Sequence, residues 1–261
     1  TTLPGGAHKT LSKHQSNGWN VVLSIPDVYY FDFPYQVDPK EPGYKWASRQ
    51  TNSRDVFTFM PDNIPLHAEF RKDTSNLPYE ANDTVQTDDA GNVIHKPLPK
   101  EYRVNGIQGQ IWSETIRTRE KVEYMLYPRL FAVAERAWHE AEWEVPYNSG
   151  GAIYNQESNV FTDALQQKQQ ASWQTFANVI GKKLLPKLDA ADIFYRIPTV
   201  GAVIKDNQLH ANIALPGLTI EYKDGNGPWT TYTAPIAVKG EVTIRARSTD
   251  GKRAGRSLIV Q

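Results

Sequence analysis

The fold is decided by two short apolar runs, each followed directly by polar and aromatic residues. The first is Asn20-Val21-Val22-Leu23-Ser24, after which residues 25–35 are expected to pass from a strand end into an aromatic loop. The second covers residues 107–111 and ends in Trp112-Ser113-Glu114-Thr115. Short apolar runs next to stop signals are typical of buried parallel strands. The sequence therefore predicts two such strands, each with residues capable of chemistry just beyond its end.

Helical patterns flank both runs. Residues 7–16 are expected to form a short helix that Asn17-Gly18 closes. From Val122 to Trp138 apolar residues recur at spacings of three and four, and Pro128 either kinks this helix or opens a second one at its N1 position. A further helix is expected over residues 163–185, ended by Pro186. Two helix–strand–loop units in series indicate a β/α architecture, in which sites lie at the C-terminal ends of the strands.

The rest of the chain divides into a long loop region and a β module. Residues 36–104 lack strong periodicity and predict a loop region with one short helix near residues 54–60. Residues 197–261 alternate in polarity and contain the turn Asp224-Gly225-Asn226-Gly227, which predicts a small immunoglobulin-like β-sandwich. We therefore expect an α/β domain over residues 1–190 and an all-β domain over residues 191–261.

The length of the α/β part conflicts with a complete barrel. A (β/α)₈ barrel needs about 250 residues, and only about 190 precede the β module. Only two convincing buried strands are found among them. Either the fold is not a barrel, or most of the barrel lies upstream of Thr1, and the pattern alone leaves both alternatives open.

Composition excludes several classes of protein. Lys+Arg and Asp+Glu both number 29, so no basic excess points to nucleic acid or to an anionic membrane surface. No apolar run approaches the roughly 18 residues of a membrane span, and the absence of cysteine excludes disulfides. The chain starts at Thr1 without Met or a signal-peptide pattern, which predicts a mature product, a deliberately shortened chain or a fragment.

Several motifs together resemble glycoside hydrolase family 20, and bacterial chitobiases within it. The segments that carry the resemblance are Val21-Val22-Leu23-Ser24 with Tyr30-Phe31-Asp32, Gly109-Gln110-Ile111-Trp112-Ser113-Glu114, Pro128-Arg129-Leu130 with Ala134-Glu135-Arg136-Ala137-Trp138, and, for chitobiases, Phe33-Pro34-Tyr35, Asp38-Pro39, Trp46-Ala47-Ser48-Arg49 and the module containing Gly251-Lys252-Arg253 and Gly255-Arg256-Ser257. The resemblance implies that the chain is the C-terminal part of a (β/α)₈ TIM barrel, with its seventh and eighth strands, followed by the β-sandwich.

The same resemblance implies an exo-acting β-N-acetylhexosaminidase of chitin degradation that removes terminal N-acetylglucosamine from chitobiose and chito-oligosaccharides. In this family the substrate's own 2-acetamido oxygen attacks the anomeric carbon, an exception to the two-carboxylate scheme. A Glu protonates the leaving oxygen, and the Asp directly before it orients the acetamide. No Asp-Glu pair occurs in the chain, so we expect the pair, and the Arg that grips the sugar, to lie upstream.

The resemblance assigns roles to five residues. Tyr30 is expected to donate its hydroxyl to the acetamide carbonyl oxygen. Asp32 and Glu114 are expected to accept hydrogen bonds from the O4 and O6 hydroxyls of the terminal sugar. Trp112 is expected to form the floor of the pocket, and Trp46 to stack on the second sugar at its rim.

The remaining aromatic and imidazole side chains are given structural roles. We assign Trp138, Trp143 and Trp173 to the core and Trp229 to the β module. His67 and His139 have no second ligand at a suitable spacing. No metal and no cofactor are therefore expected.

Two alternatives to an enzyme fragment stay open: a non-catalytic carbohydrate-binding module, and a purely structural piece. The expected partners are chitobiose or a chito-oligosaccharide and the N-terminal part of the same protein, with no nucleic acid and no membrane span. Unpaired strand edges predict oligomerisation, disorder in residues 36–104 or a complementing N-terminal piece. A periplasmic or secreted location follows from the resemblance alone.

Overall fold

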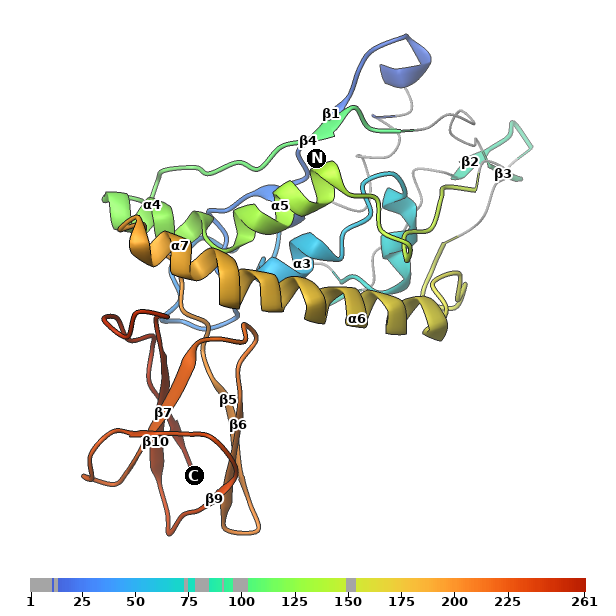
Figure 1. Ribbon diagram of the computed structural model, residues 1–261. Helices are drawn as coiled ribbons and strands as arrows, with labels where there is room; N and C mark the ends of the chain where they lie inside the picture. Colours follow the sequence, from blue (N-terminus) through green and yellow to red (C-terminus); the bar gives the residue numbers. More distant parts are fainter. Residues whose placement is uncertain are drawn as a thin grey trace. The chain divides into compact units, whose positions relative to one another are not determined.

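The computed structural model describes residues 11, 14–72, 75–77, 85–90, 92–95, 103–148 and 154–261 of the chain (Figure 1). The chain divides into two compact units, each described here by itself. The first comprises Thr1–Arg117 and Arg129–Ala171, and the second comprises Thr118–Pro128 and Ser172–Gln261. The domain boundary at residue 190 stays a prediction.

Two short parallel strands form the centre of the first unit. Strand β1 (Val22–Leu23) pairs with β4 (Gly106–Ile107), which lies 84 residues away in sequence, and an isolated parallel bridge joins Tyr30 to Gln110. The prediction of two parallel strands is confirmed. The expectation that the first run is buried on both faces is wrong, because Val22 is 55% exposed while Leu23 is buried. Since the strands are parallel, the residues that follow them meet at the same edge.

The segment after β1 contains one helical turn that the sequence reading missed. Helix α2 (Pro26–Tyr29) starts with Pro at its first turn, where the missing N–H costs nothing. Val28 and Tyr29 are fully buried. The expected passage from strand into loop is therefore wrong, and Tyr30 returns to the strand direction through its bridge with Gln110.

The first unit draws much of its core from the segment predicted to be a long loop. Helix α3 (Ser53–Phe57) begins with a capping box between Asn52 and Asp55, and the 3₁₀ helix η1 (Ile64–Glu69) follows. The predicted short helix is confirmed, but the prediction of loop or disorder is wrong for these residues. Fully buried side chains there are Val56, Phe57, Phe59, Met60 and Leu66. Further on, β2 (Val85–Thr87) and β3 (Val93–His95) pair antiparallel, and the rest of this region lies largely outside the described residues.

His67 is a neutral base buried in this core. Its ring stacks on Phe59 with centroids 4.3 Å apart, and its Nε2 accepts a hydrogen bond from the Met60 amide at 3.0 Å. Burial, and secondarily the charge of Arg71, holds the pKa of His67 well below its usual value. The imidazole therefore stays neutral in the folded chain under conditions that protonate it in the unfolded chain.

We expect this histidine to make stability pH-dependent. Below about pH 6.5 the unfolded state binds a proton that the folded state refuses, so the free energy of unfolding falls by up to about 1.4 kcal/mol per pH unit. His67→Gln, which does not titrate, should flatten this slope. Urea unfolding of the original chain and of His67→Gln between pH 5 and 7 measures how the free energy of unfolding depends on pH. Equal slopes for the two proteins would contradict the conclusion that His67 is buried and neutral.

Pro128 separates two helices, so the alternative of one kinked helix is wrong, and the second helix begins one residue after Pro128 rather than with Pro128 at N1. Helix α4 (Arg119–Leu126) ends before it, and α5 (Arg129–Trp138) begins directly after it. Helix α5 packs against α3. Of the tryptophans assigned to the core, Trp143 and Trp173 are buried, but Trp138 is 90% exposed because it ends α5 on its outer side.

The long helix continues past Pro186, contrary to prediction. Helix α6 (Asp163–Val179) passes through a π turn, η3 (Ile180–Leu184), into α7 (Leu185–Ala190). The wider turn lets the Leu185 amide donate to the Ile180 carbonyl and places Pro186 in the first turn of α7, where proline is tolerated. Gly181 has a packing role, since a Cβ there would lie 1.8 Å from the Pro216 carbonyl oxygen.

The second unit contains two antiparallel sheets (Figure 1). One sheet has the order β5-β6-β9 and the other β11-β10-β7-β8. Along β10 every second residue is buried, and these residues are Val242, Ile244 and Ala246. The predicted all-β module is confirmed at this level. The strands are β5 (Gly201–Lys205), β6 (Gln208–Asn212), β7 (Thr219–Asp224), β8 (Thr230–Thr231), β9 (Ile236–Ala237), β10 (Val242–Arg247) and β11 (Leu258–Val260).

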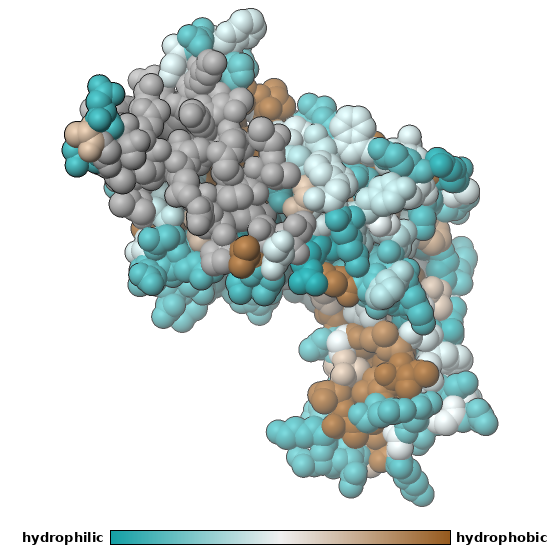
Figure 2. Space-filling model, turned by 180° about the vertical axis from the view of Figure 1, so that it is seen from behind, coloured by the Kyte–Doolittle hydropathy of each residue, from teal (hydrophilic) through white to brown (hydrophobic). Residues whose placement is uncertain are grey.

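The β module also has an apolar outer face. Figure 2 shows apolar side chains gathered there. Val203 on β5 and Ile259 on β11 are 56% and 64% exposed, and the two strands contact each other. Trp229, by contrast, is covered by the Arg245 guanidinium at 3.7 Å. Among the described residues, no helix combines the length and apolar character that crossing a membrane requires.

Candidate functional site

The candidate site lies where the chain leaves β1 and β4, in the first unit. Tyr30 pairs with Gln110 in the parallel bridge, and the Phe31 amide donates to the Gln110 carbonyl at 2.6 Å. These contacts fix the start of the segment that carries Tyr30 and Asp32. They also bring it beside Trp112, two residues after Gln110.

Three aromatic rings meet at this point. The Tyr30 ring lies 5.8 Å from the Trp46 ring and 5.6 Å from the Trp112 ring, both in edge-on geometry. The Phe33 ring also packs against the Trp46 ring, with centroids 5.2 Å apart. Trp46 and Trp112 are 52% and 44% exposed. The structure thus brings together three residues predicted from sequence and leaves large apolar ring surface open to solvent.

Asp32 is a buried carboxylate at the edge of these rings. Its side chain accepts a hydrogen bond from the Trp46 indole, with Nε1 and Oδ2 3.3 Å apart. The other oxygen, Oδ1, is buried and has no hydrogen-bond partner in the described part of the chain. A buried carboxylate oxygen without a donor is costly, so Oδ1 is suited to accept a hydrogen bond from a ligand.

Burial has the largest effect on the ionisation of Asp32. Desolvation raises the pKa of this carboxyl, whereas the hydrogen bond from Trp46 lowers it. The charge of Glu114 raises the pKa further, and the charge of Arg129 lowers it. Glu114 itself is exposed. Four of the predicted residues are therefore joined by ring contacts or a hydrogen bond, and Glu114 follows Trp112 by two residues and affects Asp32 through its charge.

Sequence reasoning missed the two residues that hold Asp32 in place. Arg129 is fully buried and donates to backbone carbonyls of the Asp32 loop. Gly43 has φ +127°, and a Cβ there would lie 2.5 Å from the Asp32 carbonyl oxygen. One signal could have revealed Arg129: it lies four residues after Met125 and four before Val133, on the apolar side of a helical pattern. A charge in that place indicates a buried partner.

The described residues contain no metal-binding cluster. No group of three or more His, Asp or Glu side chains there could hold an ion. His139 instead contacts Glu135 on the same helix at 2.8 Å. The candidate site is therefore built from aromatic rings and carboxylates.

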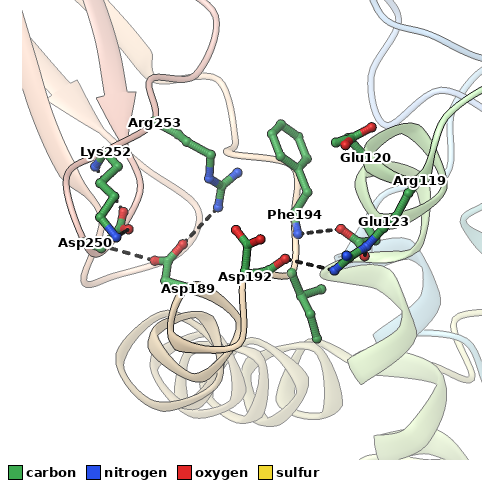
Figure 3. A pocket seen from close by; sticks show the side chains of 10 residues that line it. Arg119, Glu120, Glu123, Asp189, Asp192, Phe194, Asp250, Lys252 and Arg253 are labelled. Atoms are coloured by element: carbon green, nitrogen blue, oxygen red, sulfur yellow. Dashed lines mark hydrogen bonds and ion pairs between the residues drawn. The ribbon is translucent and has the colours of Figure 1, made fainter.

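The second unit has a separate, strongly charged pocket of about 230 Å³ (Figure 3). Its three cations each pair with a carboxylate of the pocket. The pairs are Arg119 with Glu123 at 2.6 Å, Arg253 with Asp189 at 2.9 Å, and Lys252 with Asp250 at 3.3 Å. Only the Arg253–Asp189 pair joins two elements, the loop after β10 and the end of α7. Helix α4 is tied to the segment after α7 by hydrogen bonds, from Arg119 Nη2 to the Asp192 carbonyl at 3.0 Å and from the Phe194 amide to Glu123 at 2.8 Å.

Comparison with known protein families finds two models that match different parts of the chain. The model of the glycosyl hydrolase family 20 catalytic domain matches residues 5–141. The model of the chitobiase/β-hexosaminidase C-terminal domain matches residues 184–257. The first match covers slightly more than half of the chain and includes all five predicted site residues.

Individual relatives extend over nearly the whole chain. An N,N'-diacetylchitobiase of Vibrio harveyi is 38% identical over 258 residues, 98% of this chain and 27% of that protein. A β-hexosaminidase B of Pseudoalteromonas piscicida is 51% identical over 166 residues, 64% of this chain and 20% of that protein. The chain thus spans less than a third of these relatives. A solved exo β-N-acetylglucosaminidase from Vibrio harveyi matches with a TM-score of 0.40 and 21% identity, over 74% of this chain and 21% of that one.

Proposed function

Because the chain belongs to glycoside hydrolase family 20, we propose that it forms the sugar-holding part of a chitobiase-type β-N-acetylhexosaminidase. In this proposal the whole protein removes terminal N-acetylglucosamine from chitobiose and short chito-oligosaccharides. Strands β1 and β4 are the last two strands of a (β/α)₈ barrel. An upstream portion supplies the earlier strands and the Asp-Glu pair that the chain lacks.

One observation carries the proposal: the buried Oδ1 of Asp32 has no hydrogen-bond partner among the described residues, and Asp32 lies beside the exposed ring of Trp46. A sugar hydroxyl is a neutral donor that satisfies such an oxygen with a charge-assisted bond. The apolar faces of a pyranose ring match the open surfaces of Trp46 and Trp112. Asp32 and Glu114 then hold the O4 and O6 hydroxyls, which limits the pocket to the end of a chain.

Tyr30 acts on the reacting group. The acetamide oxygen of the substrate attacks the anomeric carbon while the glycosidic C–O bond breaks, and the leaving oxygen takes a proton from the upstream Glu. The Tyr30 hydroxyl donates to the acetamide oxygen and holds it in line. Water then attacks the anomeric carbon and gives a proton to the same Glu, while the bond from that carbon to the acetamide oxygen breaks and the acetamide is restored.

The test is hydrolysis of a chromogenic N-acetylglucosaminide. The 261-residue chain alone is expected to give no turnover, because it has no general acid. The chain completed with an upstream portion, either in one polypeptide or mixed in two pieces, is expected to be active. We refer to this active form as the completed protein. Turnover by the chain alone, or an inactive completed protein, overturns the proposal.

The exposure of Trp46 and Trp112 favours a second candidate, a carbohydrate-binding module without catalysis. It predicts that the chain alone binds chitobiose, measured by titration calorimetry, and that Trp112→Ala abolishes the heat. Under the first proposal the chain alone binds weakly, because half of a pocket neither excludes water nor pre-organises its donors.

A further inference from the structure

We infer that Arg129 is a positioning residue for Asp32: its buried guanidinium fixes the backbone on both sides of that carboxylate. That Arg129 helps to hold a sugar rests on the proposed function. That Arg129 positions Asp32 does not rest on it. Arg129 starts helix α5 and touches no open surface.

The hydrogen bonds of Arg129 converge on the Asp32 loop. Nη2 donates to the Phe31 carbonyl at 2.7 Å, and Nη1 donates to the Phe33 carbonyl at 2.8 Å. These are the residues directly before and after Asp32. Nη1 also donates to the Thr51 carbonyl at 2.9 Å, which ties the far end of the loop to the same group. Only a planar guanidinium offers donors in this fixed, forked arrangement.

Aromatic rings hold the guanidinium itself. Its central carbon lies 3.9 Å from the Tyr35 ring centroid and 4.8 Å from that of Phe31. Both rings belong to the same loop and are buried. Cation–π contacts of this kind strengthen when water is excluded. The cation and the loop therefore form one packed body.

The charge of Arg129 also supports the chemistry of Asp32. Burial raises the pKa of the Asp32 carboxyl most, and the hydrogen bonds from the Trp46 indole and from the Asp32 backbone lower it; the charge of Glu114 then raises it and the charge of Arg129 lowers it. Only the ionised carboxylate forms a charge-assisted bond with a neutral sugar hydroxyl. Arg129 therefore offsets part of the effect of burial.

The chain offers a matched control for substitution of Arg129. Arg136 lies two turns later on α5 and is also buried. Its guanidinium packs over Phe57 and Trp143 and pairs with Glu144, away from the Asp32 loop. Arg136→Met removes a buried arginine of the same kind, so it reports what general damage to α5 does.

The first readout needs no sugar. Trp46 donates to Asp32, so its fluorescence should change as Asp32 titrates. Asp32→Asn and Trp46→Phe identify that transition in the 261-residue chain. In Arg129→Met the midpoint should move to higher pH. In Arg129→Lys, which keeps the charge, and in Arg136→Met it should stay in place.

The second readout is the kinetics of the completed protein. Tyr30 is held by its bridge to Gln110 rather than by Arg129, so the effect should fall on KM more than on kcat. Arg129→Lys and Arg129→Met should raise KM about tenfold, the equivalent of one charged hydrogen bond. Arg136→Met should leave KM unchanged.

The outcomes separate the two proposals. A shifted midpoint in Arg129→Met without sugar hydrolysis by the completed protein refutes the proposed function and leaves the coupling to Asp32 in place. Hydrolysis with an unshifted midpoint and an unchanged KM overturns the inference about Arg129. If Arg129→Met does not fold, Arg129→Lys decides: a raised KM supports the inference, and an unchanged KM overturns it.

Discussion

Tyr30→Phe is expected to lower the kcat of the completed protein by about 10²- to 10³-fold, the loss that follows removal of one donor to a developing charge. KM should change little, because the ring stays between Trp46 and Trp112. Steady-state hydrolysis of a chromogenic N-acetylglucosaminide measures both constants. The size of the effect reflects the position of the hydroxyl, which the bridge to Gln110 determines.

The preceding residue gives a closely matched control. Tyr29 is fully buried, packs edge-on against Phe59, and has a hydroxyl without a hydrogen-bond partner among the described residues. Tyr29→Phe removes the same atom one position away and should leave kcat unchanged. Equal losses from the two substitutions would show that Tyr30 contributes packing and not a donor.

Asp189→Asn is expected to cost about 3 kcal/mol of stability, the lower end of the range for breaking a buried ion pair. Asp189 accepts from Arg253 Nη2 at 2.9 Å, from the Tyr195 hydroxyl at 2.9 Å, and from the Thr249 amide and hydroxyl. The Asp250 amide also donates to it. The side-chain amide of Asn replaces one acceptor oxygen of Asp189 with an NH₂ donor, which then faces the donors that bind Asp189. The change also leaves the Arg253 charge without its carboxylate partner.

Asp192→Asn is the control for this substitution. Asp192 lines the same pocket, but it is exposed. It adopts φ 53°, a conformation that Asn tolerates equally well. The exchange should change stability by less than about 0.5 kcal/mol. Thermal unfolding of the 261-residue chain compares Asp189→Asn with Asp192→Asn. Equal changes in the melting temperature of the two variants would mean that the Asp189–Arg253 ion pair does not contribute to stability.

The sequence predicted which residues lie close together, whereas their roles stay predictions and parts of the scaffold were missed. Tyr30, Asp32, Trp46 and Trp112 could be named because a parallel strand pair brings its carboxyl ends together and because the motifs were recognisable. Helix α2 could not be predicted, since four residues carry no period and the aromatic run reads equally well as a loop. The continuation through Pro186 was missed because it depends on a π turn, which widens the helix without any signal in the sequence.

The misassigned side chains show why local patterns fail. Trp138 fits an apolar spacing but ends helix α5 on its exposed side, and no local rule reports on which side a helix packs. The position of Arg129 on the apolar side of a helical pattern indicates a buried charge, but the pattern does not show that its partners are the carbonyls of the Asp32 loop. Those carbonyls come from residues about 80 to 100 positions away in sequence, so tertiary structure decides the role of Arg129.

Gly43 limits how the rim of the candidate site can be engineered. Its backbone lies against the Asp32 carbonyl, which also accepts from the Tyr44 amide at 3.0 Å. Any side chain at residue 43 would displace the segment that leads to Trp46 from the segment that holds Asp32. Random libraries directed at the rim should therefore keep this glycine. Grafts from other family members should exchange residues 30–46 as a single piece. The segment that holds Asp32 and the segment that leads to Trp46 then keep their spacing.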